Sequence, residues 1–125
     1  EHKFWKKIIR SITQFSQVEK VLAAGQTRAS LILKNNVQVD IRVVPEDEFG
    51  AALFYFTGSK EHNIQLRTMA KQKGWKVNEY GVFDTKTGRR LAGKTEAEIY
   101  SLFGLKYIPP EKRIGKDELI KARIN

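Results

Sequence analysis

Apolar and polar residues alternate strictly along residues 37–43, and this pattern restricts the fold more than any other feature of the sequence. One set contains Val37, Val39, Ile41 and Val43, and the other contains Gln38, Asp40 and Arg42. Successive side chains of a β-strand point to opposite faces of the sheet. The pattern therefore predicts a strand over residues 37–44 with one face in a core and one in solvent.

The residues before this strand predict its partners. Residues 29–33 are mostly apolar, and Asn35-Asn36 suits a tight hairpin because asparagine tolerates positive φ. Another short strand is expected over residues 19–24. Residues 3–16 predict an amphipathic helix, since apolar side chains recur at helical spacing at Phe4, Ile8, Ile12 and Phe15. A helix followed by several antiparallel strands indicates an α+β fold.

Pro45 marks a boundary between two predicted domains, residues 1–45 and residues 46–125. Beyond it we expect two helices, over residues 46–56 and 59–73, with Ser59 as N-cap of the second and Gly74 as its stop. The remaining elements are a strand over 76–83, a polar turn region over 84–93, a helix from a Thr95–Glu98 capping box to Phe103, and a last helix over 117–124.

The composition excludes several classes of protein. The 125 residues contain no cysteine, so disulfides and cysteine-based metal sites are absent. No apolar run reaches the ~20 residues of a membrane span, and we expect a cytoplasmic protein with no membrane partner. The net charge of +9 is spread along the chain, with +5 in residues 1–44 and +4 in residues 45–125. A phosphate polyanion such as a nucleic acid is its natural partner, and a solvated basic surface is the alternative.

Asp40 is the first candidate site residue. A carboxylate in the middle of a strand is held rigidly, which suits a hard cation such as Mg²⁺, and Arg42 on the same face is placed to orient it. The alternative is a solvent-facing Asp–Arg pair that contributes little. One carboxylate cannot hold two catalytic metals, so Asp40 alone predicts an incomplete site.

The stretch "FYFTGSKEHNIQLR", residues 54–67, is the second candidate. At ~100° per residue, one arc of the predicted helix carries Lys60, Asn63, Arg67 and Lys71. A helix beginning at Gly58-Ser59 offers free N–H groups to an anion, and an aromatic side chain beside it can stack on a sugar or base. We assign Phe54 to the core. For Tyr55, Phe56 and Gly58, the spacing fits a position in the core and a position in a ligand-binding cleft equally well.

Two weaker candidates are polar. Asn78-Glu79-Tyr80 lies between Val77 and Val82, and its side chains either face the same cleft or form an edge strand with a turn. Residues 25–28, "GQTR", form a polar turn that suits a contact with a phosphate of the nucleic-acid backbone. The hydroxyl of Thr27 would make this contact.

Four segments in this order, "GQTRASLILKNNVQVDIRVVP", "ALFYFTGSKEHNIQLR", "GWKVNEYGVFD" and "YIPPEKR", resemble the family X DNA polymerases, the group of DNA polymerase β. The resemblance covers nearly all of the chain and is strongest to bacterial and archaeal members. It implies that residues 1–45 are the end of a nucleotidyltransferase palm with an antiparallel sheet. It implies that residues 46–125 are the small helical and β thumb that selects the nucleotide.

The resemblance also implies roles for single residues. Asp40 matches the third palm carboxylate, which binds the catalytic metal, and Arg42 matches the arginine that pairs with palm carboxylates. The residues implied to bind the nucleotide are Tyr55 and Phe56 at the sugar, Gly58 and Ser59 at a cis-peptide turn, and Asn63 at the minor-groove edge. Arg67 matches the arginine that senses the template strand, and Glu79 and Tyr80 match the pair that holds this arginine in the open form. The other residues that we expect to contact DNA, without a role implied by the resemblance, are Thr27, Gln38, Lys60 and Lys71.

Departures from the family pattern limit how many of these residue roles can be transferred to this sequence. The Gly-Ser motif for the triphosphate and the paired Asp-x-Asp for both metals belong upstream of Glu1 in the family's order. Lys60 replaces an acid, Ile64 a template-contacting lysine and Gln38 an arginine of the eukaryotic relative.

The sequence therefore predicts part of a monomeric DNA polymerase. Its parent transfers a nucleotidyl group from a dNTP to a primer 3′-hydroxyl in gapped or primer-template DNA, using two Mg²⁺ in repair, while the isolated chain is inactive. The alternatives are a non-catalytic basic nucleic-acid-binding module and a nucleotidyltransferase acting on RNA or a small molecule.

Overall fold

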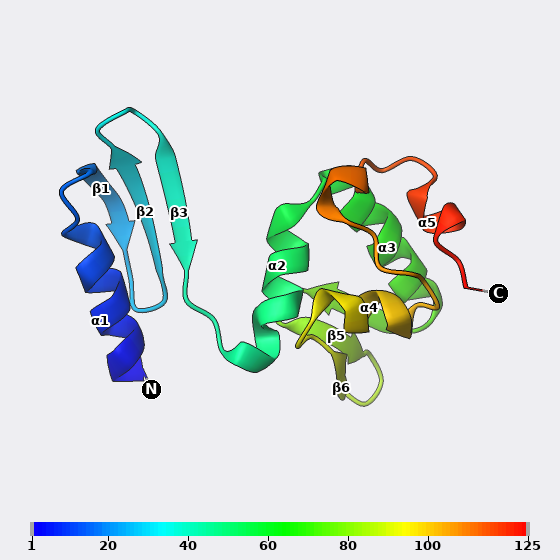
Figure 1. Cartoon of the computed structure of the whole chain (residues 1–125). Helices are drawn as coiled ribbons and strands as arrows, with labels where there is room; N and C mark the ends of the chain where they lie inside the picture. Colours follow the sequence, from blue (N-terminus) through cyan, green and yellow to red (C-terminus); the bar gives the residue numbers. More distant parts are fainter. Residues whose placement is uncertain (1, 125) are drawn as a thin grey trace. The chain divides into compact units, whose positions relative to one another are not determined.

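The computed structural model describes residues 2–124, and the chain divides into two compact units at the bond between Val44 and Pro45 (Figure 1). The predicted domain boundary lies one residue later, after Pro45. Within residues 2–124, no helix is long and apolar enough to cross a membrane.

The first unit is one helix on a three-stranded antiparallel sheet (Figure 1). Helix α1 (His2–Thr13) precedes strands β1 (Val18–Ala24), β2 (Arg28–Leu33) and β3 (Gln38–Arg42), which lie in sequence order. Pairing between β2 and β3 is regular, whereas β1 pairs with β2 through two register shifts. The unit's small core contains Ile9, Ala29 and Leu31, with Ile12, Val18, Ile41 and Val43 packed against it.

The alternating pattern behaves as predicted over Gln38–Arg42, but this strand is shorter than the predicted residues 37–44, and Val37 of the apolar set is 49% exposed. Along β3, Val39 and Ile41 are half-buried, while the three polar residues between and beside them are exposed. Asn36 adopts a φ of 67° in the hairpin before β3, and the Asn35 side chain accepts a hydrogen bond from Val37 N at 3.2 Å. The hairpin is therefore confirmed, with asparagine at its left-handed position.

The second unit packs helices around another three-stranded antiparallel sheet. A 3₁₀ turn, η1 (Glu46–Glu48), leads into α2 (Phe49–Thr57) and α3 (Lys60–Gln72). Strands β4 (Trp75–Asn78), β5 (Gly81–Asp84) and β6 (Arg90–Ala92) follow. Helix α4 (Glu96–Leu102), a second 3₁₀ turn η2 (Pro110–Lys112) and α5 (Glu118–Lys121) complete the unit. Its core is centred on Phe54, Leu66, Val82, Ile99 and Tyr100. Both units confirm an α+β fold.

Two helix starts are set by their caps. Ser59 Oγ accepts from His62 N at 3.2 Å at the start of α3, and Thr95 Oγ1 accepts from Glu98 N at 3.1 Å at the start of α4. The second arm of the predicted capping box differs, because Glu98 accepts from Gly93 N at 3.1 Å. Both caps satisfy backbone N–H groups that have no partner within their helix.

Four predicted elements are wrong in detail. Residues 76–83 form two strands joined by a turn, because Asn78 Oδ1 accepts from Tyr80 N at 2.8 Å and reverses the chain. Strand β6 lies in the predicted turn region, where pairing with β5 orders it. The last helix is confined to Glu118–Lys121, and the first ends at Thr13.

Candidate nucleotide and DNA site

The junction between α2 and α3 brings most of the predicted nucleotide-binding residues together. Gly58 has a φ of 76°, and the peptide bond between Gly58 and Ser59 is cis. Ser59 N donates to Arg113 O at 3.1 Å, so a segment far along the chain anchors the turn. Helix α3 begins at Lys60, directly after this anchored residue.

The aromatic run before the turn has two environments. Phe54 is 1% exposed and meets the Tyr100 ring edge-on at 5.7 Å between centroids, which confirms that it belongs to the core. Phe56 is 52% exposed, and Tyr55 is half-buried. Their two rings stand at 85° with centroids 5.2 Å apart. An edge-to-face pair of one half-buried and one exposed aromatic ring therefore flanks the turn.

Asn63 connects α3 to this aromatic pair. Its Nδ2 donates to Tyr55 O at 2.9 Å, and the residue is only 8% exposed. Its Oδ1 is buried and has no hydrogen-bond partner among the residues that the structure describes. A buried acceptor without a donor is costly, so Asn63 is suited to receive a hydrogen bond from a ligand.

The basic arc of α3 is exposed, but Asn63 is not part of that exposed surface. Lys60, Arg67 and Lys71 are exposed, whereas the neighbouring arc is largely buried at Leu66, Met69 and Ala70, as expected. Arg67 Nε donates to Asn63 O at 3.4 Å. The helix therefore presents three cations to solvent beside a buried amide.

Asp40 lies in the first unit, exposed on the outer strand β3, with Arg42 exposed two residues on. Hydrogen bonds from Ser30, its register partner on β2, and from Gln38, at 3.2 Å, hold the pKa of the Asp40 carboxyl below its usual value. Asp40 is therefore a carboxylate at neutral pH. Among residues 4–124, whose side chains the structure describes, no group of three or more His, Cys, Asp or Glu side chains is placed to hold a metal ion.

The remaining candidates lie on turns. Thr27 is half-buried between β1 and β2, and its carbonyl accepts from Val43 N at 2.7 Å. Glu79 is half-buried and Tyr80 is 51% exposed in the turn between β4 and β5. A contact of this pair with Arg67 stays a prediction.

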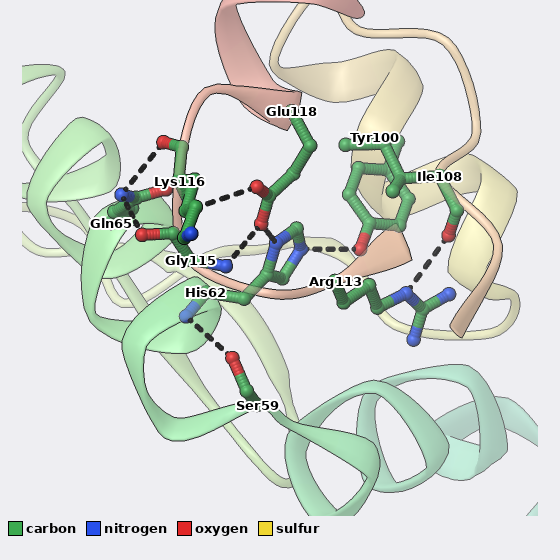
Figure 2. A network of polar contacts seen from close by, with 9 residues as sticks. All are labelled: Ser59, His62, Gln65, Tyr100, Ile108, Arg113, Gly115, Lys116 and Glu118. Atoms are coloured by element: carbon green, nitrogen blue, oxygen red, sulfur yellow. Dashed lines mark hydrogen bonds and ion pairs between the residues drawn. The ribbon is translucent and has the colours of Figure 1, made fainter. Parts of the chain in front are cut away.

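Spacing and composition did not reveal the buried polar network that lies behind α3 (Figure 2). His62 is 0% exposed, with Nδ1 at 2.6 Å from Glu118 Oε2 and Nε2 at 2.8 Å from Tyr100 Oη. One available signal was helical position, because His62 precedes the buried residues Leu66 and Ala70 by one and two helical turns.

A second buried pair lies beside this network. Arg113 donates through Nη1 to Glu96 Oε2 at 2.7 Å and through Nε to Ile108 O at 2.8 Å. Its guanidinium carbon lies 5.4 Å from the centre of the Tyr100 ring and 5.6 Å from that of Tyr107. This pairing and the surrounding rings offset the burial of the arginine, while its Nη2 has no hydrogen-bond partner among the described residues.

Comparisons with known proteins identify the family. The family model described as DNA polymerase beta thumb matches residues 52–114. The chain is 38% identical over 115 residues to the DNA polymerase/3′-5′ exonuclease PolX of Bacillus subtilis, a match that covers 90% of this chain and 20% of that protein. It is 30% identical over 117 residues to the Repair DNA polymerase X of African swine fever virus, covering 91% of this chain and 67% of the viral protein.

The match to the human DNA-directed DNA/RNA polymerase mu is shorter, at 38% identity over 78 residues, or 62% of this chain and 16% of that protein. The chain thus spans about a fifth of the length of the Bacillus subtilis relative. The matched model and the viral relative together show that the chain belongs to the family X DNA polymerases and contains their thumb domain.

Proposed function

We propose that the chain is the nucleotide-selecting and DNA-binding part of a DNA polymerase that fills short repair gaps. The complete enzyme would transfer a nucleotidyl group from a dNTP to a primer 3′-hydroxyl. Residues 45–125 would supply nucleotide selection and DNA contacts as the thumb, and residues 1–44 would supply one metal-binding carboxylate as the end of the palm. We also propose that the chain is monomeric and acts in the cytoplasm.

The observation that carries the proposal is the arrangement at Asn63. Its buried Oδ1 lacks a donor among the described residues, and its Nδ2 binds the carbonyl of Tyr55, next to the exposed Phe56. At the minor-groove edge, the amino group of guanine offers a hydrogen-bond donor, and a sugar offers an apolar face for an aromatic ring. Asn63, Tyr55 and Phe56 therefore provide the two kinds of contact that a nucleotide requires.

The three exposed cations of α3 supply the contact with DNA. Lys60, Arg67 and Lys71 follow one another at helical spacing and face solvent. Phosphate contacts of this kind position a protein on the duplex and make its affinity sensitive to salt. Since Arg67 lies one helical turn beyond Asn63, the same helix can contact the template strand and the new base pair.

Asp40 supports an enzyme over a non-catalytic module. A self-contained module is expected to bury or pair this carboxylate, whereas Asp40 is exposed on an outer strand and accepts hydrogen bonds from Ser30 and Gln38. Its oxygen chemistry fits Mg²⁺ as one ligand, and further ligands must come from other residues. One carboxylate does not make a two-metal site, so we expect the isolated chain to be inactive.

DNA binding tests the proposal directly. Fluorescence anisotropy with a gapped duplex should show weak binding whose affinity falls steeply with salt. Replacing Lys60, Arg67 and Lys71 by Ala should lower the salt slope by about one unit for each phosphate that these side chains neutralise. The matched control replaces the exposed Lys94, Lys106 and Lys112, which removes the same charge from other surfaces of the unit.

Equal losses of affinity in the two triple variants would show that only net charge matters and would contradict a DNA-binding face on α3. Primer extension by the purified chain, assayed with Mg²⁺ and dNTPs, should give no product. Extension above background would refute the proposed inactivity.

A further inference from the structure

Residues 113–118 hold the first turn of α3 by several independent contacts (Figure 2). Besides the bond from Ser59 N to Arg113 O, Gln65 Nε2 donates to Gly115 O at 2.9 Å and to Lys116 O at 3.1 Å. A Cβ on Gly115 would lie 2.3 Å from the Cβ of Glu61, so the two backbones are in close contact. We call residues 113–118 the clamp segment.

His62 and Glu118 form the centre of this attachment. Besides its contact with His62 at 2.6 Å, the Glu118 carboxylate accepts from Gly115 N at 2.7 Å and from Lys116 N at 2.8 Å. Glu118 therefore orders the clamp segment and binds α3 at the same time. The opposite nitrogen of His62 contacts Tyr100 of α4, so the imidazole joins three elements.

One set of proton positions fits the geometry of this network. Burial alone would raise the pKa of Glu118, but the hydrogen bonds from His62 and from backbone N–H groups lower it to about 2. The carboxylate is ionised at neutral pH, so Nδ1 of His62 carries a proton. Burial raises the pKa of Tyr100, so its hydroxyl keeps its proton, and this hydroxyl lies 2.8 Å from Nε2 of His62. With the proton of the imidazole on Nδ1, Nε2 is free to accept from Tyr100 Oη, and both ring nitrogens have a partner.

Directional bonds of this kind fix geometry. A buried polar network is worth little against an apolar replacement of the same shape, but removing one partner is costly, and the intact network fixes the position of the elements that it joins. His62 directly precedes Asn63, and the Ser59 cap binds the N–H of His62. A rotation of this turn would displace the buried amide and move Lys60 and Arg67 with it.

We propose that His62 is a positioning residue, which fixes the first turn of α3 against the clamp segment and so holds Asn63 and the basic face in their working geometry. The inference rests on the proposed function, because this geometry would serve nucleotide selection and DNA binding. Gly115 and Glu118 lie outside residues 52–114, the part of the chain that the thumb family model matches. The clamp segment would therefore add residues to the nucleotide-selecting module.

The test compares His62→Phe with a control of similar stability. The Phe variant keeps an aromatic ring and loses both hydrogen bonds, and Tyr100→Phe loses only one. The control is Val77→Ala, a core truncation on β4 that leaves the network intact. We expect amide hydrogen exchange at residues 59–63 to be about tenfold faster in His62→Phe than in the control, with a smaller effect in Tyr100→Phe.

Two further readouts separate positioning from simple packing. Imidazole ¹⁵N shifts of the wild-type chain should show the neutral Nδ1–H tautomer of His62. His62→Phe should weaken binding to the gapped duplex several-fold, while Val77→Ala should not.

Exchange and DNA affinity in His62→Phe that match those of the control would overturn the inference. If the wild-type chain binds no DNA, the proposed function fails by itself, and the exchange rates still decide whether His62 positions the turn.

Discussion

The side-chain amide of Asn63 donates to the backbone carbonyl of Tyr55 at 2.9 Å, which joins the start of α3 to the end of α2 across the turn at Gly58. One bond therefore connects the aromatic pair to the helix that carries the basic face. Because the other amide atom of Asn63 has no donor among the described residues, the same side chain both stabilises the turn and offers an acceptor.

Replacing Asn63 by Ala should lower the free energy of unfolding by about 1 kcal/mol, since one partly buried hydrogen bond is removed together with an unpartnered oxygen. Urea denaturation measures this change. Thr68→Ala on the exposed face of α3 is the control. A loss of stability several times larger would mean that Asn63 has contacts beyond the bond to Tyr55.

Truncation of the two phenylalanines, Phe54 and Phe56, should lower stability to very different extents. Phe54→Ala removes a fully buried ring and should cost ~3–5 kcal/mol of stability. Phe56→Ala should cost less than ~1 kcal/mol, because its ring is 52% exposed. In the complete polymerase, Phe56→Ala should instead raise KM for the dNTP, because the proposed contact of the ring with the sugar is lost. Thermal unfolding of both variants and steady-state kinetics of the second check this contrast.

Glu118 should make the free energy of unfolding depend on pH in the acidic range. The pKa of Glu118 is about 2 in the folded chain against an ordinary value of 4.5, so its contribution is present above pH 4.5 and is lost as the pH falls toward 2. Glu118→Gln should be less stable than the wild type at pH 6, by roughly 3 kcal/mol if the shift is fully expressed. The difference should shrink below pH 4.5 in urea denaturation. A difference that does not change with pH would show that the ionised carboxylate is not the source.

A buried and an exposed ion pair of the second unit should differ greatly in their effect. Glu96→Ala leaves the buried Arg113 guanidinium without its carboxylate and should cost ~3–5 kcal/mol. Asp117→Ala breaks an exposed pair with Lys121, whose side chains are 62% and 76% exposed, and should cost under ~0.5 kcal/mol. Thermal denaturation of both variants measures the difference. Equal losses of stability would contradict the burial assigned to Arg113.

Gly115 and Gly88 offer a matched pair of substitutions. Both adopt positive φ, at 82° and 74°, so Ala at either position should cost ~1 kcal/mol from backbone strain alone. A Cβ at Gly88 meets nothing within 4 Å, whereas at Gly115 it would overlap Glu61. Gly115→Ala should therefore lose a further ~1–3 kcal/mol and speed amide exchange at residues 59–63. Equal effects at the two positions would exclude close contact between the clamp segment and α3.

Local patterns predicted the elements that depend on local physics. The alternation around Asp40, the Asn36 hairpin and the Ser59 cap all follow from neighbours within a few residues, and the structure confirms them. The strand predicted over 76–83 was wrong because an apolar pattern does not reveal the side-chain bond that reverses the chain at Asn78. Strand β6 was missed because its order comes from pairing with β5.

The candidate site divides in the same way. Helical spacing identified the exposed basic arc of α3 and the core position of Phe54. It did not reveal the network of His62, because its partners Tyr100 and Glu118 lie 38 and 56 residues further along the chain. Pairing at such separations depends on the tertiary fold, which the spacing of one segment does not contain.

The separation of 56 residues between His62 and Glu118 also sets an order of assembly during synthesis. When α3 leaves the ribosome, the partner of its buried imidazole has not yet been made, and at ~5–20 residues per second it follows only seconds later. In that interval the imidazole lacks its carboxylate and the Ser59 amide lacks the Arg113 carbonyl. The helix that would inspect an incoming nucleotide is therefore completed by a segment that the ribosome makes well after it.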